Sequence, residues 1–122
     1  MQPPAFNRSI VEDLLGSNDP AVVAAYVDLF RTTLEVDLMP RLEAALAAGD
    51  LKQMVFWLHS LKGVAAHAGA EWLVAEALDV ERLLRRALSE NQSITPDLDA
   101  VRAAATAASA GVAALVAAAG AP

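Results

Sequence analysis

Cysteine is absent from the 122-residue chain, and histidine occurs only twice, at His59 and His67. Without cysteine the chain can form neither a disulfide framework nor a thiolate metal site. The two histidines are eight positions apart, which corresponds to about 12 Å along a helix axis. They cannot bind one metal ion from a shared helix, so a metalloenzyme is a poor interpretation. We expect no metal ion and no cofactor of the chain's own.

Positive charge is also scarce. Nine lysines and arginines face fifteen acidic residues, which gives a formal net charge of −6. Proteins that bind nucleic acid need a positive field to attract phosphates, so we expect no nucleic-acid partner. The length fits one domain over residues 1–122, with room for one core but not for a complete nucleotide-dependent kinase.

Long, strongly apolar runs are missing as well. Residues 100–119 are nearly uncharged, but they are mostly alanine, interrupted by threonine, serine, glycine and an arginine. A membrane span needs about 20 strongly apolar residues, so we interpret this segment as a terminal bundle helix. Its expected core stripe is Val101, Ala105, Ala108, Val112, Leu115 and Val116. The N-terminal residues lack the apolar region of a signal peptide, and we expect a cytoplasmic protein without membrane contact.

Start and stop signals divide the chain into helices. Asn7 or Ser9, Asp19 and Asp50 are side-chain caps at expected helix starts, and Gly16, Gly49 and Gly69 lie at expected ends. Threonine and proline at 95–96 repeat the cap-then-proline start seen at 19–20. Pro40 predicts a kink or break near residues 38–40. The expected helices cover residues 7–15, 20–49, 51–67, 70–90 and 96–119. The fold class is therefore all-α, an antiparallel up-and-down four-helix bundle with a short additional N-terminal helix across one end.

The segment 51–67 places a histidine opposite an apolar face. At 100° per residue, Met54, Trp57, Leu58, Leu61, Val64, Ala65 and Ala68 form one broad face that must point into the bundle. His59 lies on the other side and is predicted to face solvent. Its neighbours there are Lys52, Val55, Phe56, Lys62, Gly63 and Ala66.

This arrangement suits a nucleophile that meets another protein. Imidazole titrates near neutrality, so its nucleophilic neutral form is available. Lys62 could donate to a phosphoryl oxygen, and Gly63 removes a side chain next to His59, which would let a partner approach. Val55, Phe56 and Ala66 would form an apolar margin. From periodicity alone, however, an isolated histidine on a helix surface is usually an ordinary surface residue, and Gly63 could mark a close helix crossing.

The run from His59 to Leu73, HSLKGVAAHAGAEWL, resembles the signature of histidine-containing phosphotransfer (Hpt) domains. The family pattern is approximately H-x-L-K-G-x-(A/S)-x-x-x-G-A-x-x-L. The resemblance extends upstream to residues 42–50 and downstream through Ala77, Val80 and Glu81, and it covers about residues 20–90. Departures occur at Val64, His67 and Ala68, which affect local packing and not the identity of His59.

The resemblance implies a phosphorelay carrier. His59 would accept the phosphoryl group on Nε2, Lys62 would stabilise it, and Gly63 would leave room for the partner. Phe30, Val55, Phe56 and Ala66 would contribute to docking. The partners would be receiver domains of response regulators or a hybrid histidine kinase, with Mg²⁺ held by the receiver. We expect a monomer without an ATP site or autokinase activity.

Three other interpretations stay open at the level of sequence. The chain could be a phosphoacceptor fragment of a larger histidine kinase, although the acidic residue and proline typical of those histidine motifs are missing. It could be the related domain of a chemotaxis-type kinase. It could also be a helical adaptor that has lost phosphotransfer. The arginines at 82, 85 and 86 are interpreted as a solvated helix face, or alternatively as a patch that steers an acidic receiver.

Overall fold

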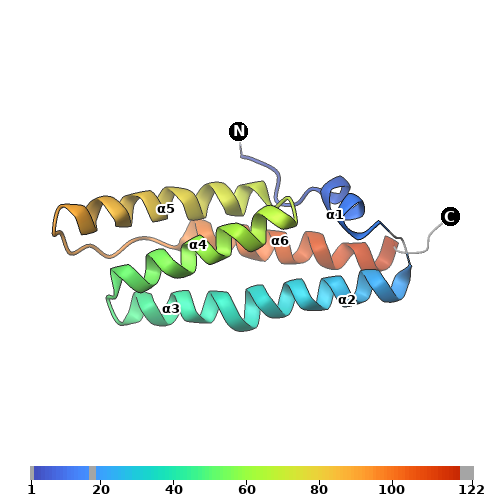
Figure 1. Ribbon diagram of the computed structural model, residues 1–122, viewed down its shortest axis with the longest axis horizontal. Coiled ribbons are helices and arrows are strands. Elements are labelled where there is room, and N and C mark those ends of the chain that lie inside the picture. The colour runs from blue at the N-terminus through green and yellow to red at the C-terminus, as the bar shows by residue number, and fades with distance from the viewer. Residues whose placement is uncertain (1, 17–18, 119–122) are drawn as a thin grey trace.

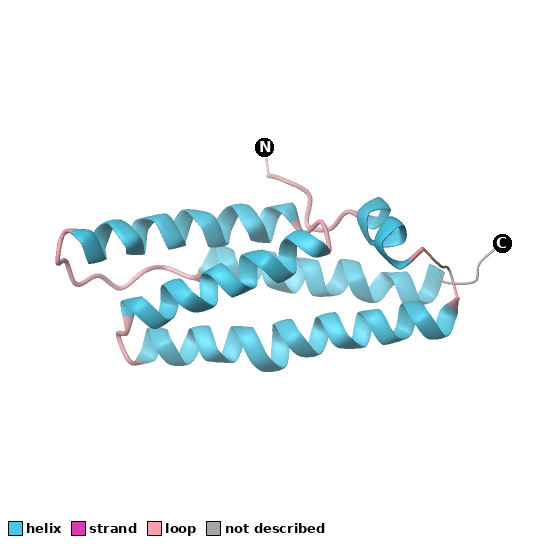
Figure 2. Cartoon of the chain, viewed as in Figure 1, coloured by secondary structure: helices cyan, strands magenta, loops and turns pink. Residues whose placement is uncertain are grey.

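The chain forms a bundle of helices in the computed structural model, which describes residues 2–16 and 19–118 (Figure 1). Within those residues no strand is present (Figure 2). The prediction of an all-helical bundle is confirmed. The elements are α1 Arg8–Leu15, α2 Pro20–Arg31, the π-helical segment η1 Thr32–Leu38, α3 Met39–Ala47, α4 Leu51–His67, α5 Glu71–Ser89 and α6 Asp99–Ala118.

Side-chain caps begin the first three expected helices. Asn7 Oδ1 accepts from the backbone N–H of Ser9 at 3.1 Å, and Asp19 Oδ1 accepts from that of Ala21 at 2.8 Å. Asp50 Oδ1 accepts from Gln53 N–H at 3.1 Å at the start of α4. Each oxygen satisfies a backbone donor that has no partner within its helix, and these predicted starts are confirmed.

The α2–η1–α3 rod stays helical through the position of Pro40 (Figure 1). Proline has no N–H, and its ring crowds the preceding turn. The turns just before Pro40 are π-helical and form η1, in which the N–H of Met39 donates to the carbonyl oxygen of Leu34. The predicted irregularity is therefore a widened turn and not a break.

The last helix begins later than predicted. The expectation that residues 95–96 start it is wrong, because α6 begins at Asp99. Pro96 and Leu98 are buried in the connection that precedes it, and this burial holds the segment against the core. Asp97 supplies the cap instead, since its Oδ1 accepts from the N–H of Asp99 at 2.9 Å.

Helix α6 packs against α2 and α5 through a stripe of small and branched residues. By length and composition alone it could span a membrane, but 39% of that window is buried within the bundle. Val116 was expected in the core stripe and is instead exposed. Arg102 ties α6 to α3, because its Nε and Nη2 donate to the two carboxylate oxygens of Glu43 at 2.6 and 2.7 Å. The buried stripe is Val101, Ala104, Ala105, Ala108, Ser109, Val112 and Leu115.

The N-terminal segment lies over the end of the bundle where α4 turns into α5 (Figure 1). The N–H of Trp72 donates to the carbonyl oxygen of Pro4 at 2.8 Å. Two glycines make room for this segment. A Cβ built on Gly69 would lie 2.6 Å from the Cβ of Asn7, and one on Gly111 would lie 2.8 Å from the Cβ of Phe6.

A pair of glycine variants should measure how tightly this segment is seated. Gly69 and Gly49 both have left-handed backbone conformations, with φ of 66° and 67°. Because alanine is strained in this conformation, alanine at either position should lower the free energy of unfolding by about 1–2 kcal/mol. Gly69→Ala also forces a clash with Asn7, whereas a Cβ on Gly49 meets nothing within 4 Å.

We therefore expect urea denaturation to show that Gly69→Ala lowers the free energy of unfolding more than Gly49→Ala does, by roughly 1–3 kcal/mol. Equal losses would contradict the packing of residues 4–10 against the α4–α5 turn.

Candidate functional site

His59 lies on an exposed strip of α4. Its side chain is 66% exposed, so the predicted orientation toward solvent is confirmed. The residues on the same strip, one and two turns away, are also exposed. They are Lys52, Phe56, Gly63 and Ala66.

Two residues expected at the docking surface are buried. Val55 is only 8% exposed, and Phe30 on α2 is 5% exposed. The expectation that Val55 lies on the exposed margin is wrong, because α5 packs against that flank of α4 and covers it. Phe30 packs in the core, with its ring stacked on Tyr26 at a centroid distance of 6.3 Å. The apolar surface around His59 is therefore provided by Phe56, which is 55% exposed, and by Ala66.

The same packing brings a carboxylate to His59. Glu81 on α5 has a side chain only 7% exposed, and its Oε1 lies 3.7 Å from His59 Nδ1. Lys62 Nζ donates to that oxygen at 3.1 Å. Arg85 Nε donates to the other oxygen, Oε2, at 2.9 Å. Lys62 is therefore already paired, one helical turn from the imidazole.

The charge of Glu81 is maintained by these cations. Burial by itself raises the pKa of Glu81, since it disfavours the charged form. Hydrogen bonds from Arg85 and Lys62, together with their positive charges, outweigh burial and hold the pKa of Glu81 below its usual range. The site therefore presents a carboxylate to the Nδ1 side of His59 and leaves the rest of the ring exposed.

Sequence reasoning did not assign a role to Glu81, which entered only as a position where the family resemblance continued. A signal was nevertheless available. Leu73, Ala77, Glu81 and Leu84 are spaced as one helical stripe, and all four are buried. A carboxylate in an otherwise apolar stripe needs partners, because an unpaired buried charge is costly. The interpretation of Arg85 as merely solvated is corrected by its bond to Glu81.

Gly63 has open space where a side chain would stand. A Cβ at this position would meet no atom within 4 Å, so no helix of the described chain crosses close to it. A close helix crossing therefore does not explain this glycine. The second histidine, His67, is exposed one turn further along α4 and borders a small hollow with Val64 and Tyr26.

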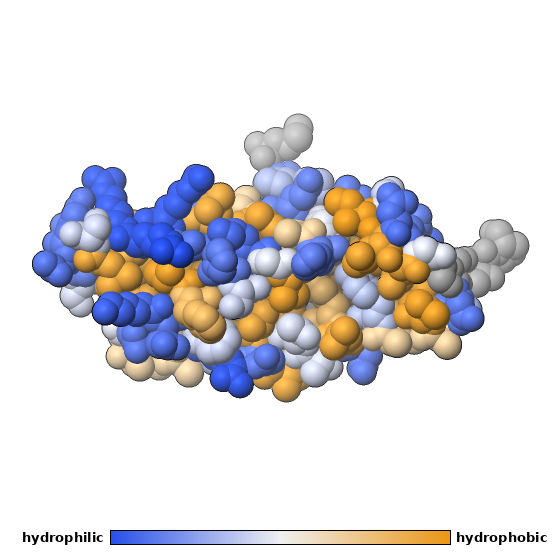
Figure 3. Space-filling model, viewed as in Figure 1, coloured by the Kyte–Doolittle hydropathy of each residue, from blue (hydrophilic) through white to orange (hydrophobic). Residues whose placement is uncertain are grey.

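An apolar groove extends from the His59 strip toward α1. Its volume is about 490 Å³, and Ala66 lies at its α4 wall, seven residues beyond His59. Figure 3 shows hydrophobic side chains gathered at the α1 end of this face and hydrophilic ones at the opposite end of α5. The lining residues are Pro3, Ile10, Ala66, Gly69, Glu71, Val74, Ala75 and Leu78.

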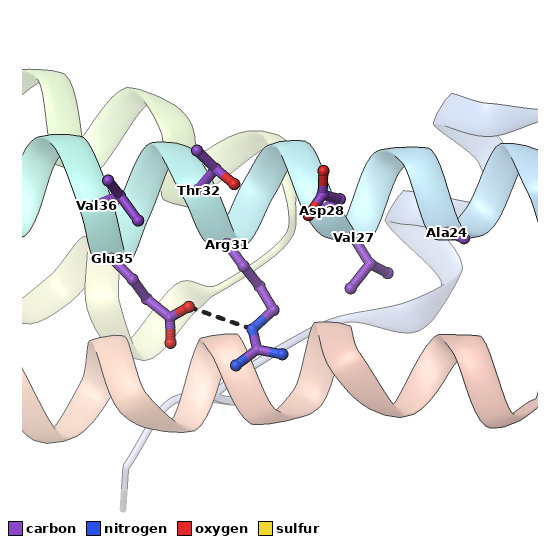
Figure 4. Close-up of a pocket in the computed structure, with 7 residues that line it drawn as sticks. All are labelled: Ala24, Val27, Asp28, Arg31, Thr32, Glu35 and Val36. Atoms are coloured by element: carbon purple, nitrogen blue, oxygen red, sulfur yellow. Dashed lines mark hydrogen bonds and ion pairs between the residues drawn. The ribbon is translucent and has the colours of Figure 1, made fainter.

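A second hollow of about 350 Å³ is lined by α2 and η1. Figure 4 shows that its lining residues come from this one rod, with Arg31 and Glu35 joined by an ion pair and extending toward α6. None of the residues around His59 lines it. Among residues 2–16 and 19–118, no group of three or more histidine and acidic side chains could hold a metal ion.

The fold and the site together define a small helical module that presents an imidazole on its surface instead of enclosing a substrate. The chain belongs to the Hpt domain family, whose model matches residues 25–118. No curated protein and no solved structure showed a significant match. Hpt domains act in phosphotransfer in two-component signalling, and they interact with receiver domains of response regulators.

Neutralising Glu81 should weaken the fold at neutral pH. In Glu81→Gln, Lys62 and Arg85 lose their anion, and we expect a loss of roughly 1–3 kcal/mol in the free energy of unfolding at pH 7. Because the pKa of Glu81 is lowered in the folded state, its contribution is present above the unfolded-state pKa of about 4.3 and disappears as pH falls through the folded-state value.

Urea denaturation of both proteins across this pH range checks the expectation. The difference in the free energy of unfolding between wild type and Glu81→Gln should become smaller as the pH is lowered. A difference that is independent of pH would contradict a charged, paired Glu81.

Proposed function

We propose that the chain is a phosphoryl carrier that relays a phosphoryl group between receiver-domain aspartates through His59. The observation that carries this proposal is the pairing of an exposed imidazole with a buried carboxylate, 3.7 Å from its Nδ1. A carboxylate on this side favours the tautomer with the proton on Nδ1. That tautomer leaves the Nε2 lone pair free to attack phosphorus.

The proposed transfer moves the phosphoryl group from an aspartate oxygen to Nε2 of His59. Nε2 of His59 attacks the phosphorus of an aspartyl phosphate, and the bond between phosphorus and the aspartate oxygen breaks. The carboxylate leaves with the electron pair, while Nδ1 keeps its proton, so the phosphorylated ring is cationic and faces Glu81. Lys62 moves from Glu81 to a phosphoryl oxygen. Transfer to a second receiver reverses these steps. Positioning and charge stabilisation supply most of the catalysis of phosphoryl transfer.

The partner completes the site. His59 lies on an open helix surface, so the receiver must contribute the Mg²⁺ and the enclosure. An interface of standard size covers about 800 Å² of each protein, and the groove wall at Ala66 begins about 10 Å along α4 from His59. A receiver centred on His59 therefore also covers this groove. Its apolar lining suits a receiver element with exposed aliphatic side chains.

The surrounding architecture agrees with this role. We infer an antiparallel up-and-down four-helix bundle made of the α2–η1–α3 rod, α4, α5 and α6, because short turns reverse the chain at 48–50 and 68–70. We further infer a monomeric cytoplasmic protein without autokinase activity. The step at His59 is the same for a free carrier and for a domain of a larger kinase.

The function is tested with receiver domains that carry labelled phosphate on their aspartates. Wild type and the matched control His67→Gln should acquire acid-labile, alkali-stable label, whereas His59→Gln should acquire none. Because His59 is exposed, the free energy of unfolding of His59→Gln should lie within about 0.5 kcal/mol of the wild-type value. Label that persists on folded His59→Gln would overturn the assignment of His59 as the phosphoryl acceptor. If wild type takes no label from any of a broad panel of receivers, the alternative of a helical adaptor without phosphotransfer is favoured.

Gly63 should separate fold stability from transfer. Gly63→Ala should raise the free energy of unfolding by about 0.5–1 kcal/mol, because glycine is a poor helix former and the added Cβ meets no atom. Gly63→Gln should keep the stable fold but slow transfer from a receiver, since its side chain occupies the approach to His59.

Urea denaturation of both variants, together with their rates of phosphoryl transfer from a receiver, checks these two expectations. If Gly63→Gln transfers at the wild-type rate, the assigned role of partner access is wrong.

A further inference from the structure

The Arg85–Glu81 pair differs from the other arginine–carboxylate pairs at i, i+4 spacing in the described chain. In the other four pairs the carboxylate is 45–56% exposed. One pair lies on α1, one joins α2 to η1, one joins η1 to α3 and one lies at the end of α5. Arg31–Glu35 in Figure 4 is an example. Glu81 is only 7% exposed. Exposed pairs of this kind contribute little, whereas a buried carboxylate depends on its partners.

The two oxygens of Glu81 have separate partners. Arg85 Nε occupies Oε2 at 2.9 Å. Lys62 Nζ occupies Oε1 at 3.1 Å, and His59 Nδ1 lies 3.7 Å from the same Oε1. The bond to Arg85 therefore restricts rotation of the carboxylate and keeps Oε1 directed at α4.

Lys62 has two competing tasks if it is to stabilise a phosphoryl group on His59. It is one of two cations paired with Glu81 in the unphosphorylated protein. If Arg85 were absent, departure of Lys62 before the ring becomes cationic would leave a buried carboxylate without a cation, and that state is strongly unfavourable. With Arg85 in place, the charge of Glu81 stays matched while Lys62 moves.

From these contacts we propose that Arg85 is a positioning residue. It holds Glu81 by Oε2, so that Lys62 can leave Oε1 for the phosphoryl group and Oε1 can then accept a hydrogen bond from Nδ1–H of His59. The inference rests on the proposed phosphoryl transfer at His59. Arg85 itself contacts neither the ring nor the phosphoryl group in this scheme, and it acts through Glu81.

The first test needs no partner protein. Nitrogen-15 NMR of the imidazole at alkaline pH, where imidazole side chains are neutral, reports which ring nitrogen carries the proton. Wild type should show His59 with the proton predominantly on Nδ1. Arg85→Gln should shift His59 toward the mixed tautomers of a free imidazole, and Arg85→Lys should restore the wild-type pattern in part. Arg86→Gln is the matched control, because Arg86 pairs with the exposed Glu90.

The second test uses phosphoramidate as a small phosphoryl donor, in which the phosphorus–nitrogen bond breaks and ammonia leaves. Arg85→Gln should be phosphorylated on His59 about tenfold more slowly than wild type, in line with the loss of an orienting partner of a functional histidine. Arg86→Gln should react at the wild-type rate, and circular dichroism should show that both variants are folded.

The outcomes separate the two proposals. Wild-type tautomers and an unchanged rate in Arg85→Gln would overturn the positioning role, even while label on His59 supports the carrier function. Failure of wild type to accept phosphate would count against the carrier function. The tautomer of His59 would then still decide whether Arg85 orients the ring through Glu81.

Discussion

A carboxylate inside a helical bundle must be matched by cations and hydrogen bonds, and Glu81 meets this requirement across the α4–α5 interface. Arg85 approaches it from its own helix, and Lys62 approaches it from α4. The imidazole of His59 lies at the edge of the same cluster. The starting position of Lys62 and the surroundings of the His59 Nδ1 atom are therefore both set by one buried charge.

This dependence explains why the site is divided between a buried half and an exposed half. The Nδ1 side of His59 faces a carboxylate that solvent hardly reaches, while the strip with Phe56, Gly63 and Ala66 stays open. In the proposed function the chain accepts a phosphoryl group from one protein and delivers it to another, so a permanently enclosed site would prevent both exchanges. In that proposal the buried half orients the ring in advance, and the partner supplies the enclosure for each transfer.

The glycines of α4 and its surroundings illustrate how one residue type serves different physical needs. Gly69 adopts a left-handed conformation that ends α4 and also makes room for Asn7. Gly111 is helical, and its missing side chain receives Phe6. Gly63 is helical too, but no part of the described chain fills the space beside it. Of these three glycines, Gly63 alone lowers helix stability without making room for another residue of the described chain.

The sequence by itself determined the features that depend on a few neighbouring residues. Asn7, Asp19 and Asp50 start their helices because a side-chain oxygen caps a donor within the same turn. The exposure of His59 follows from the apolar face opposite it, and the Hpt signature follows from the residues between His59 and Leu73.

Tertiary structure decided which flank of α4 is covered. The helical wheel placed Val55 beside His59, but α5 packs on that flank, buries Val55 and brings Glu81, 22 positions away in sequence, to the imidazole. It also decided the start of α6, where burial of Pro96 and Leu98 overrides a local cap-and-proline signal. Local signals act within about one helical turn, whereas the choice of flank depends on how all the apolar faces of the bundle fill one core together.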